Sequence, residues 1–504
     1  MTQKMRINKV VWDFLGLGKR YCIDSSSGRI LVFVLVLVTT TLSFYKNTFH
    51  IANKEWFNHF QKDTEASVIG KVLSDKYGLD TQGYGMVYPS QDSNPTYGNL
   101  DIYTMLKDNI KPQSMFIYRS SIGLQGYISS FVYHYFRLSD IVILNALVAF
   151  LAAFVVIIVS VLLGKIFGVM FGIVFFISLF FSPWVVCYGN NLYHCIFMWF
   201  VPAVFSFLLF LHIRSGLESK IYPNLDSASN TAVVGGGGGF LEPKNSQNKT
   251  YNNHNSKIKN NAYIIFLLSC YCVAIFMRCL CSYEYLTSII LFSLSVFFVA
   301  FLLSFVKAQT LSPQMKYIIF PLIPCKVAVR YIVILFVLGV FGFVLAFALH
   351  TYIRGNGDML QGLKDIYQQD FLRRMISGDS KNFDPAFAKS IESSVIDVVW
   401  QYFKYPSLTA FLPSNRAVFL LFICIDVVLI RYVITAKSLK ILCSVMLICF
   451  ALPALSWYVF GKAHSFIHTH MNYILWSFGF VATLFYIPVV AFFQRMATSK
   501  SSDK

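Results

Sequence analysis

Residues 140–163 read DIVILNALVAFLAAFVVIIVSVLL, and this stretch decides the fold class. After Asp140 it carries no charge, and its apolar residues form one block rather than following helical or strand spacing. A block of about 20 such residues is long enough to cross a roughly 30 Å hydrocarbon core as a helix. A membrane barrel would need alternating apolar and polar residues instead. We therefore predict a membrane-spanning helix here.

Ten blocks of this kind occur along the chain. They cover residues 30–45, 140–163, 167–183, 195–212, 262–279, 286–306, 331–349, 417–435, 441–460 and 473–493. The composition agrees, because 56% of the 504 residues are hydrophobic and 13% are charged, whereas soluble proteins carry about 25% charged residues. We predict an all-α membrane protein with about ten transmembrane helices.

The first block has a second interpretation, a cleaved signal peptide, because basic residues precede it. No small-residue cleavage site follows, since the next residues are Tyr45-Lys46-Asn47-Thr48-Phe49. We therefore predict that residues 30–45 are retained as the first span.

The spans divide the chain into five parts. These are a basic cytoplasmic N-terminus (1–29), a transmembrane module (30–212) with a large first outer loop (46–139), a flexible cytoplasmic linker (213–261), a second transmembrane module (262–495) with an outer loop (350–416), and a cytoplasmic tail (496–504). Within the first outer loop, residues 116–136 are apolar and aromatic but carry Arg119, Gln125 and His134. This mixture predicts an amphipathic helix that lies on the membrane or re-enters it.

The orientation follows from the distribution of Lys and Arg. With a cytoplasmic N-terminus, the inner segments hold 23 Lys and Arg and 6 acidic residues, and the outer segments hold 19 and 17. Positive charge concentrates on the cytoplasmic side of membrane proteins. The net charge of +18 is therefore interpreted as this bias and not as nucleic-acid binding, which needs a soluble basic patch. Both termini are predicted to be cytoplasmic.

Two acidic residues, Asp63 and Glu65, follow shortly after the first span. A carboxylate held near a membrane surface can act as a general base. The alternative is a pair of solvated acids on a loop.

A polar and aromatic segment, 182–194, joins two predicted spans on the outer side. Its Asn190, Asn191 and Tyr193 are candidates for hydrogen bonds to a sugar, whose C–H surface packs well on an aromatic face. An aromatic belt at the membrane interface with a Gly-Asn-Asn turn is the alternative.

Three charged residues stand close to predicted hydrocarbon: Arg278, Glu284 and Arg354. Such charges are expensive and are usually paired or functional. Arg278 and Glu284 either form a structural ion pair or bind and orient a phosphate. Arg354 is placed to bind phosphate at the outer rim, although an Arg that merely reaches for the interface is equally common.

The block from residue 462 to 472 contains Lys462, His464, His468 and His470. His464 and His468 share a helix face, whereas His470 lies about 200° around from His468. One regular helix therefore cannot direct all three rings at one metal ion, and we predict no metal ligands here. Contacts to phosphate or hydroxyl groups are the favoured interpretation, and a structural histidine cluster is the alternative.

Together these features resemble the GT-C superfamily of membrane glycosyltransferases, which have many spans, a large first outer loop with acidic residues, and chemistry on the outer face. The blocks at 182–193, 283–285 and 462–472 resemble more closely a poorly characterised bacterial group of GT-C-like polytopic membrane proteins. The resemblance covers roughly residues 25–495. The chain departs from the family pattern in lacking a clean Asp-Asp or Asp-Glu pair.

The resemblance implies transfer of a sugar from a polyprenyl-phosphate donor in the membrane lipid to a glycan or protein acceptor outside the bacterial inner membrane. Glu65 or Asp63 would deprotonate the acceptor hydroxyl. The donor is already activated, so no cofactor is required, and a divalent metal is left open. The alternatives are a transporter or flippase of a lipid-linked glycan and a surface-polysaccharide polymerase.

Overall fold

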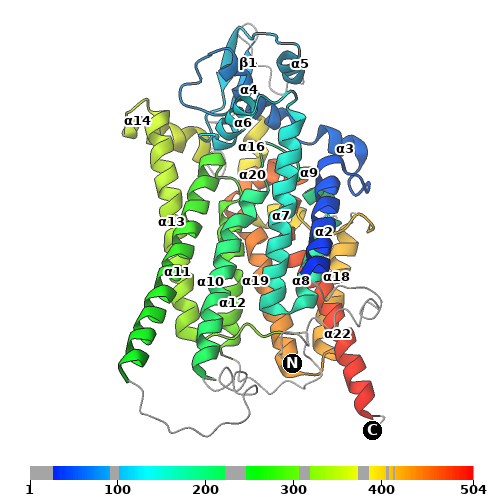
Figure 1. Ribbon diagram of the computed structural model, residues 1–504. Coiled ribbons are helices and arrows are strands. Elements are labelled where there is room, and N and C mark those ends of the chain that lie inside the picture. The colour runs from blue at the N-terminus through cyan, green and yellow to red at the C-terminus, as the bar shows by residue number, and fades with distance from the viewer. Residues whose placement is uncertain are drawn as a thin grey trace.

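The computed structural model describes residues 26–90, 101–221, 246–305, 318–372, 385–403, 408–412 and 415–502. Within this part of the chain, seven helices are long and apolar enough to cross a membrane, and an eighth span is formed by a bent pair. The predicted all-α, multi-pass membrane protein is therefore confirmed. Figure 1 shows these helices running side by side as one bundle.

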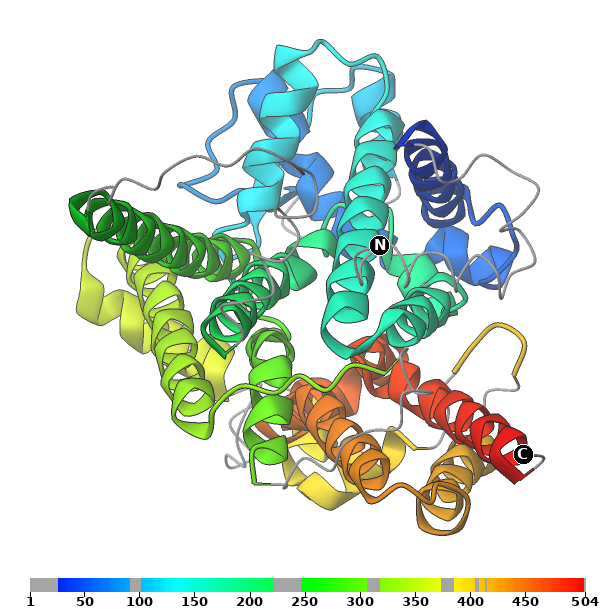
Figure 2. The ribbon, with the colours of Figure 1, turned by 60° about the horizontal axis from the view of Figure 1, so that its bottom comes forward.

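The seven single helices correspond to seven predicted spans. They are α2 (Ser26–Lys46), α7 (Val142–Phe167), α10 (Phe197–Ile221), α11 (Ser246–Cys281), α12 (Leu286–Leu303), α13 (Cys325–Arg354) and α19 (Lys437–Phe460). In a view turned toward the other end of the bundle, α2 and α13 lie at its periphery (Figure 2). Accordingly only 17% and 22% of their apolar windows are buried by other parts of the protein.

The last predicted span, 473–493, is broken in the structure. Its two halves are α21 with η5 (Thr469–Asn472 and Tyr473–Ser477) and α22 (Phe480–Ser502), which meet at a bend of 43°. Gly479 lies at the break with φ of +98°. A Cβ added there would lie 2.2 Å from the Phe450 ring, so only glycine fits both the backbone conformation and the space.

Two of the ten predicted spans are not long apolar helices. The block at 167–183 forms α8 (Val169–Phe180), whose 12 residues extend about 18 Å, well short of a bilayer core. The block at 417–435 forms α18 (Arg416–Val428) and the π-helical turn η4 (Leu429–Val433). These carry Arg416, Asp426 and Arg431. The prediction of about ten spans is thus corrected to seven, or eight with the bent pair, in the described part of the chain.

The predicted first outer loop forms a folded cap at one end of the bundle (Figure 1). Its elements are α3 (Lys54–His59), α4 (Lys62–Lys76), β1 (Val87–Ser90), α5 (Asp101–Lys107), β2 (Ser114–Ile117) and α6 (Leu124–Tyr135). The two strands are antiparallel, with Val87 opposite Ile117. Helix α4 packs so closely on β1 that a Cβ at Gly70 would lie 1.8 Å from the Val87 carbonyl oxygen.

The stretch 116–136, predicted as one amphipathic helix, is helical only in α6, because its first two residues belong to β2. Helix α6 buries Gln125, Gly126, Ser129 and Ser130, and it packs against α4. Its opposite face exposes apolar side chains, of which Phe131 is 62% exposed. An apolar face turned away from the protein suits a helix that lies on a membrane.

The predicted loop 350–416 lies at the same end of the bundle as the cap (Figure 1). It contains α14 (Met359–Ile366), η2 (Tyr367–Phe371), α16 (Pro385–Glu392) and α17 (Val395–Gln401). Two short helices from other segments, α9 (Pro183–Tyr188) and α20 (Lys462–Ile467), complete this region. We call this the polar end of the molecule.

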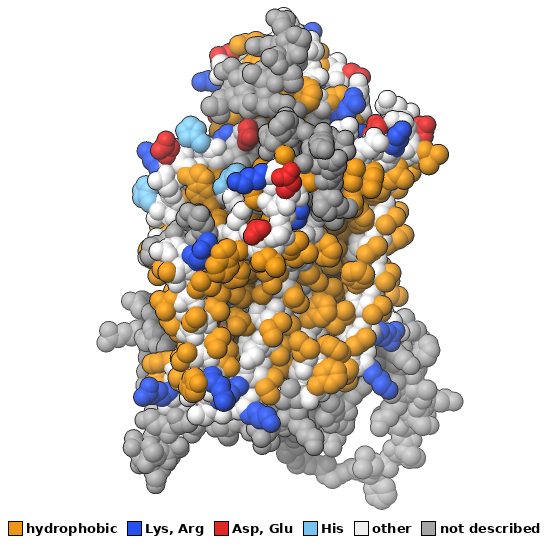
Figure 3. Space-filling model, turned by 180° about the vertical axis from the view of Figure 1, so that it is seen from behind, with side chains coloured by type: hydrophobic (Ala, Val, Ile, Leu, Met, Phe, Trp, Pro, Cys, Tyr) orange, Lys and Arg blue, Asp and Glu red, His pale blue; other side chains and the backbone are white. Residues whose placement is uncertain are grey.

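The surface shown in Figure 3 separates into three zones. A broad hydrophobic belt covers the middle of the bundle, Lys and Arg side chains line the rim opposite the cap, and acidic and basic side chains are mixed at the polar end. Such a belt is typical of a lipid-facing surface.

The predicted linker 213–261 is helical at both ends, because α10 extends to Ile221 and α11 begins at Ser246. Residues 222–245 lie outside the described part, as do 1–25 of the predicted basic N-terminus and the last two residues of the predicted tail.

Candidate functional site

Three of the segments singled out in the sequence meet at the polar end. The segment before α10 contributes His194, the last turn of α11 contributes Arg278, the connection between α11 and α12 contributes Glu284, and α20 contributes His464. These four side chains, which we call the inner cluster, are 1–7% exposed. The predictions of Arg278, Glu284 and His464 as site residues therefore converge on one place, although they are far apart in sequence.

Glu284 is the centre of the inner cluster. Its Oε1 lies 3.6 Å from Nε2 of His464 and 3.4 Å from the Tyr193 hydroxyl. Arg278 donates from Nη2 to the backbone carbonyl of Glu284, at 2.9 Å, and its guanidinium lies 5.9 Å from the centre of the Trp199 ring. A buried carboxylate thus has a cation and two titratable side chains around it.

The inner cluster contains polar atoms that lack a hydrogen bond. Among the described residues, no partner exists for Nε and Nη1 of Arg278, Nε2 of His194 or Nδ1 of His464. Burial lowers the pKa of His194 to about 3, so this ring is neutral near pH 7. Buried polar atoms without partners are rare in folded proteins and indicate bound water, a ligand or a catalytic role.

The histidines of the 462–472 block form a row that leads from the inner cluster to the surface. The helix breaks at His468, which caps both α20 and α21. The ring centres of His464 and His468 are 4.6 Å apart, and those of His468 and His470 are 5.9 Å apart. His470 is exposed, with Nε2 3.4 Å from Nε2 of Gln61 in the cap. The described residues contain no group of three or more side chains that could hold a metal ion.

Lys462 has a different environment from the histidines. Its buried Nζ donates to the backbone carbonyls of Ile391 and Ser393, at 2.7 and 2.8 Å. Burial lowers the pKa of Lys462. The ammonium group therefore ties α20 to the end of α16, and its predicted contact with substrate stays untested.

Glu65 is completely buried in the cap, at the start of α4. Its Oε1 accepts hydrogen bonds from Asn145 Nδ2, at 2.6 Å, and from the Leu192 backbone N–H, at 3.0 Å. Its Oε2 accepts from the Tyr103 hydroxyl, at 2.6 Å, and from Lys62 Nζ. Burial raises the pKa of Tyr103, so its hydroxyl keeps its proton and acts as a donor. The Glu65 carboxylate thus accepts hydrogen bonds from four donors, and those from Asn145 and Leu192 join the cap to α7 and to the segment before α10. We call Glu65 and its four donors the Glu65 knot.

Asp63, the other predicted base, is exposed and accepts a hydrogen bond from the Thr64 backbone N–H, at 2.8 Å. Burial lowers the pKa of His470, and the charge of Asp63 acts in the opposite direction. The two acids predicted as a pair thus have opposite environments, one at the surface and one inside the protein.

The predicted sugar contacts in the 182–194 segment are occupied by hydrogen bonds that shape the segment. Asn191 is buried, and its Oδ1 accepts from the backbone N–H groups of Tyr193 and His194, at 3.0 and 3.1 Å. Asn190 donates to the Tyr45 carbonyl, at 3.0 Å. These amides hold the turn that positions His194 and Tyr193 beside Glu284, which is the usual role of Asn in a turn.

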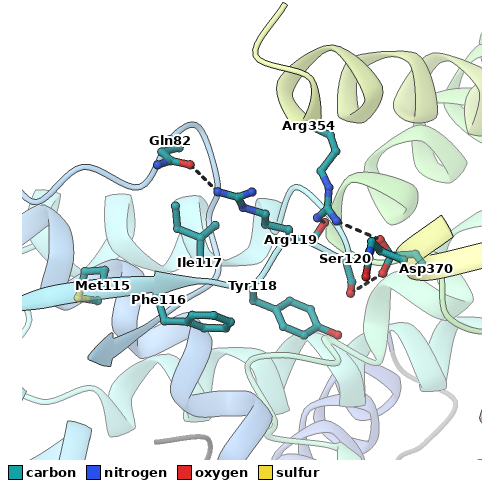
Figure 4. A pocket seen from close by; sticks show the side chains of 10 residues that line it. Gln82, Met115, Phe116, Ile117, Tyr118, Arg119, Ser120, Arg354 and Asp370 are labelled. Carbon is teal, nitrogen blue, oxygen red and sulfur yellow. Dashed lines mark hydrogen bonds and ion pairs between the residues drawn. The ribbon is translucent and has the colours of Figure 1, made fainter. Parts of the chain in front are cut away.

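Arg354 lies in a separate place, at the end of α13. There a cavity of about 530 Å³ opens between the cap, on the side of β2, and η2. It is lined by Gln82, Met115, Phe116, Ile117, Tyr118, Arg119, Ser120, Arg354, Gln369 and Asp370. Figure 4 shows the Arg354 guanidinium directed toward Asp370, which lies beside Ser120, and the Arg119 guanidinium directed toward Gln82. We call this the arginine cavity.

The hydrogen bonds of the arginine cavity leave its cations partly available. Arg354 donates from Nη1 to the Arg119 carbonyl, at 3.0 Å, and its Nη2 is 3.9 Å from Asp370 Oδ2. Among the described residues, its buried Nε has no hydrogen-bond partner. Arg119 is exposed and bonds Gln82 Oε1 at 2.9 Å, and Ser120 donates to Asp370 Oδ1 at 2.8 Å. Two guanidinium groups at one opening are suited to an anion.

A hydrogen-bonded connection joins the arginine cavity to the segment that carries Glu284. His350, fully buried on α13, bonds the Arg119 carbonyl through Nε2 at 3.0 Å and the Tyr283 hydroxyl through Nδ1 at 3.2 Å. Tyr283 immediately precedes Glu284. The cavity and the inner cluster are thus linked through one histidine and one tyrosine.

Several residues of these sites were not assigned a role from the sequence. His194 ends the polar segment 182–194, and its position beside Tyr193 is the signal that the sequence offers for it. Arg119 was noted as a charge in an apolar stretch. Asn145, Tyr103 and Ser120 carried no signal, because each is recognised only through a partner distant in sequence.

The chain matches no protein-family model, no curated protein and no solved structure. Helix length and hydropathy show a multi-pass integral membrane protein.

Proposed function

We propose that this protein is a membrane glycosyltransferase, which moves a sugar from a polyprenyl-phosphate donor to an acceptor on the outer side of the membrane. The observation that carries the proposal is the arginine cavity, which is lined by Arg354, at the polar end of the lipid-facing helix α13, and by Arg119, just after β2 in the cap. A lipid-linked phosphate has its charge at the headgroup and its chain in the membrane, so it matches this position.

The orientation in this proposal follows from charge. Lys and Arg line the rim of the bundle opposite the cap (Figure 3), and such a rim faces the cytoplasm in most membrane proteins. The polar end, with the cap and the arginine cavity, then faces outward, and both ends of the chain lie on the cytoplasmic side.

The reaction needs a cation and a proton acceptor. The bond between the sugar carbon and the phosphate oxygen breaks, the acceptor oxygen bonds that carbon, and the acceptor proton passes to a base. Arg354 and Arg119 stabilise the charge that develops on the leaving phosphate. Asp370 is the carboxylate that lines the same cavity, so we assign it the role of base.

This assignment differs from the bases expected from the sequence. Glu65 is completely buried and has four donors, which supports a structural role. Asp63 is exposed beside His470 and stays the alternative base.

The test uses the purified protein in lipid nanodiscs with a panel of polyprenyl-phosphate hexoses and pentoses. The readout is release of polyprenyl phosphate, which also detects slow transfer to water and needs no known acceptor. Arg354→Gln should reduce the rate about 100-fold, as expected for loss of one group that stabilises the transition state. Arg330→Gln is the matched control, because Arg330 is exposed near the opposite end of α13.

Asp370→Asn separates the roles within the cavity, since it should lower the rate while leaving donor binding nearly unchanged. Release from no member of the panel, combined with movement of a labelled lipid-linked glycan across the bilayer, would replace the proposal with a transporter. An Arg354→Gln variant that releases polyprenyl phosphate at the wild-type rate would show that the arginine cavity has no part in the reaction.

A further inference from the structure

A row of titratable side chains leads from the interior of the polar end to its surface. It begins at Glu284, which is 6% exposed, and continues through His464, at 3.6 Å, to His468 and His470. No residue of this row lines the arginine cavity, and the proposed reaction does not require the row.

The inner end of the row has unmet hydrogen-bonding capacity. His464 Nδ1, His194 Nε2 and two nitrogen atoms of Arg278 are buried, and no described residue bonds them. Buried water commonly satisfies such atoms, with about three hydrogen bonds to each molecule. The ring centres of His464 and His468 are 4.6 Å apart and those of His468 and His470 are 5.9 Å apart, so water that bonds the nitrogen atoms of neighbouring rings can connect them.

We propose that Glu284, His464, His468 and His470 form a path that carries a proton between a buried carboxylate and the solvent. When Glu284 releases a proton, its O–H bond breaks and an N–H bond forms on His464. His464 gives up the proton on its other nitrogen to water, and His468 and His470 repeat the exchange. One proton reaches bulk water, and no atom is oxidised or reduced. Histidine suits this role because it both accepts and donates protons near neutral pH.

Other charged and titratable groups surround the path and are part of its behaviour. Arg278 from α11 and His194 face its inner end, together with the hydroxyl groups of Tyr193 and Tyr285. Further titratable groups on the elements packed around it are Tyr188 on α9, Lys462 on α20, Tyr402 just after α17, Tyr458 on α19 and, at the outer end, Asp63 in the cap. A cation thus stands near the inner end and a carboxylate near the outer end.

The test measures protonation of Glu284 directly. The full-length protein in nanodiscs is shifted rapidly from about pH 8 to about pH 5, the range in which histidine titrates, and the carboxylic-acid infrared band is followed. Glu284→Gln identifies the band by removing it. His468→Leu should slow its appearance at least about tenfold, because an added barrier of about 1.4 kcal/mol has that effect on a rate.

Two controls make the result specific. His470→Gln should slow the band less than His468→Leu, because solvent reaches the exposed end of the path. His59→Gln should leave the rate unchanged, because His59 is equally exposed but lies on α3, outside the row. Should His468→Leu fail to fold, His468→Gln keeps a polar side chain without a titratable ring. A wild-type protein without the band, or a wild-type rate in the folded His468 variant, would overturn the proposal.

Discussion

The Glu65 knot and the inner cluster are both built around a buried carboxylate at the polar end, yet their hydrogen bonding is opposite. Each oxygen of Glu65 receives two donors. In the inner cluster, four nitrogen atoms of Arg278, His194 and His464 have no partner among the described residues. The first carboxylate is part of a complete network, and the second lies in an incomplete one.

This difference separates a structural role from a functional one. A buried charge is tolerated when its hydrogen bonds are complete, and removal of one partner then destabilises the protein strongly. Buried polar atoms without partners are instead a sign of water, ligand or chemistry. On this argument Glu65 joins segments of the fold, and the inner cluster is available for proton exchange.

The largest expected effect on stability is that of Glu65→Leu. This change leaves the Lys62 ammonium and the Leu192 N–H without their acceptor, and we expect a loss of about 3–5 kcal/mol in the free energy of unfolding. Glu65→Gln retains one oxygen acceptor and should lose about 1–3 kcal/mol. Thermal unfolding in detergent measures both. A Glu65→Gln variant that unfolds like wild type but loses turnover would instead identify Glu65 as the catalytic base.

A second test disturbs the packing of α4 on β1 and replaces none of the residues of the Glu65 knot. In Gly70→Ala the new Cβ would lie 1.8 Å from the Val87 carbonyl oxygen, so α4 has to move away from β1. Overpacking of this kind destabilises by up to about 3 kcal/mol. Gly216→Ala, where a Cβ meets nothing within 4 Å, is the control in the same unfolding assay. Equal stability of the two variants would show that α4 is not tightly packed against β1.

The inner cluster should make the stability of the protein depend on pH. The pKa of His194 is about 3 in the folded protein and 6.5 in its ordinary state, so below pH 6.5 the unfolded chain binds the proton and the folded chain does not. Stability is therefore lost as the pH falls, by about 2 kcal/mol at pH 5. His194→Phe should remove this part of the pH dependence. The difference in melting temperature between the two proteins, measured from pH 7 to pH 5, gives the contribution, and parallel curves would contradict it.

The two smallest effects are expected for Arg278→Met in the inner cluster and for Asp63→Asn at the surface. Arg278 makes one hydrogen bond to the backbone carbonyl of Glu284, so Arg278→Met, which keeps much of the aliphatic volume, should cost only about 1–2 kcal/mol. Asp63→Asn at the surface should change stability by about 0.5 kcal/mol or less. A loss for Arg278→Met as large as that for Glu65→Leu would mean that both regions are structural.

The apolar blocks predicted most of the bundle, because about 20 consecutive apolar residues leave little choice of structure in a membrane. They failed where length or charge intervened. The block at 167–183 contains Gly168, whose backbone, with φ of +111°, separates α7 from α8, so that the remaining helix has 12 residues. In the block at 417–435, Asp426 and Arg431 interrupt the apolar run.

The candidate site was predicted only in part. Charge and composition singled out Arg278, Glu284, His464 and Arg354, because polar residues beside hydrocarbon are unusual. The environment of Glu65 was not predictable, since its donors Asn145 and Leu192 are 80 and 127 residues away in the chain. Spacing along one helix says nothing about a partner on another.

The break in the last span has a consequence for how the protein assembles. The carbonyl of Met471 accepts a hydrogen bond from Tyr188, and Asn472 accepts from Tyr458 at its carbonyl and from Tyr285 at its side chain. The three donors come from α9, from the residue before α12 and from α19, so these hydrogen bonds form only when those elements are in place. The bent C-terminal segment therefore gains this stabilisation after the earlier helices have assembled.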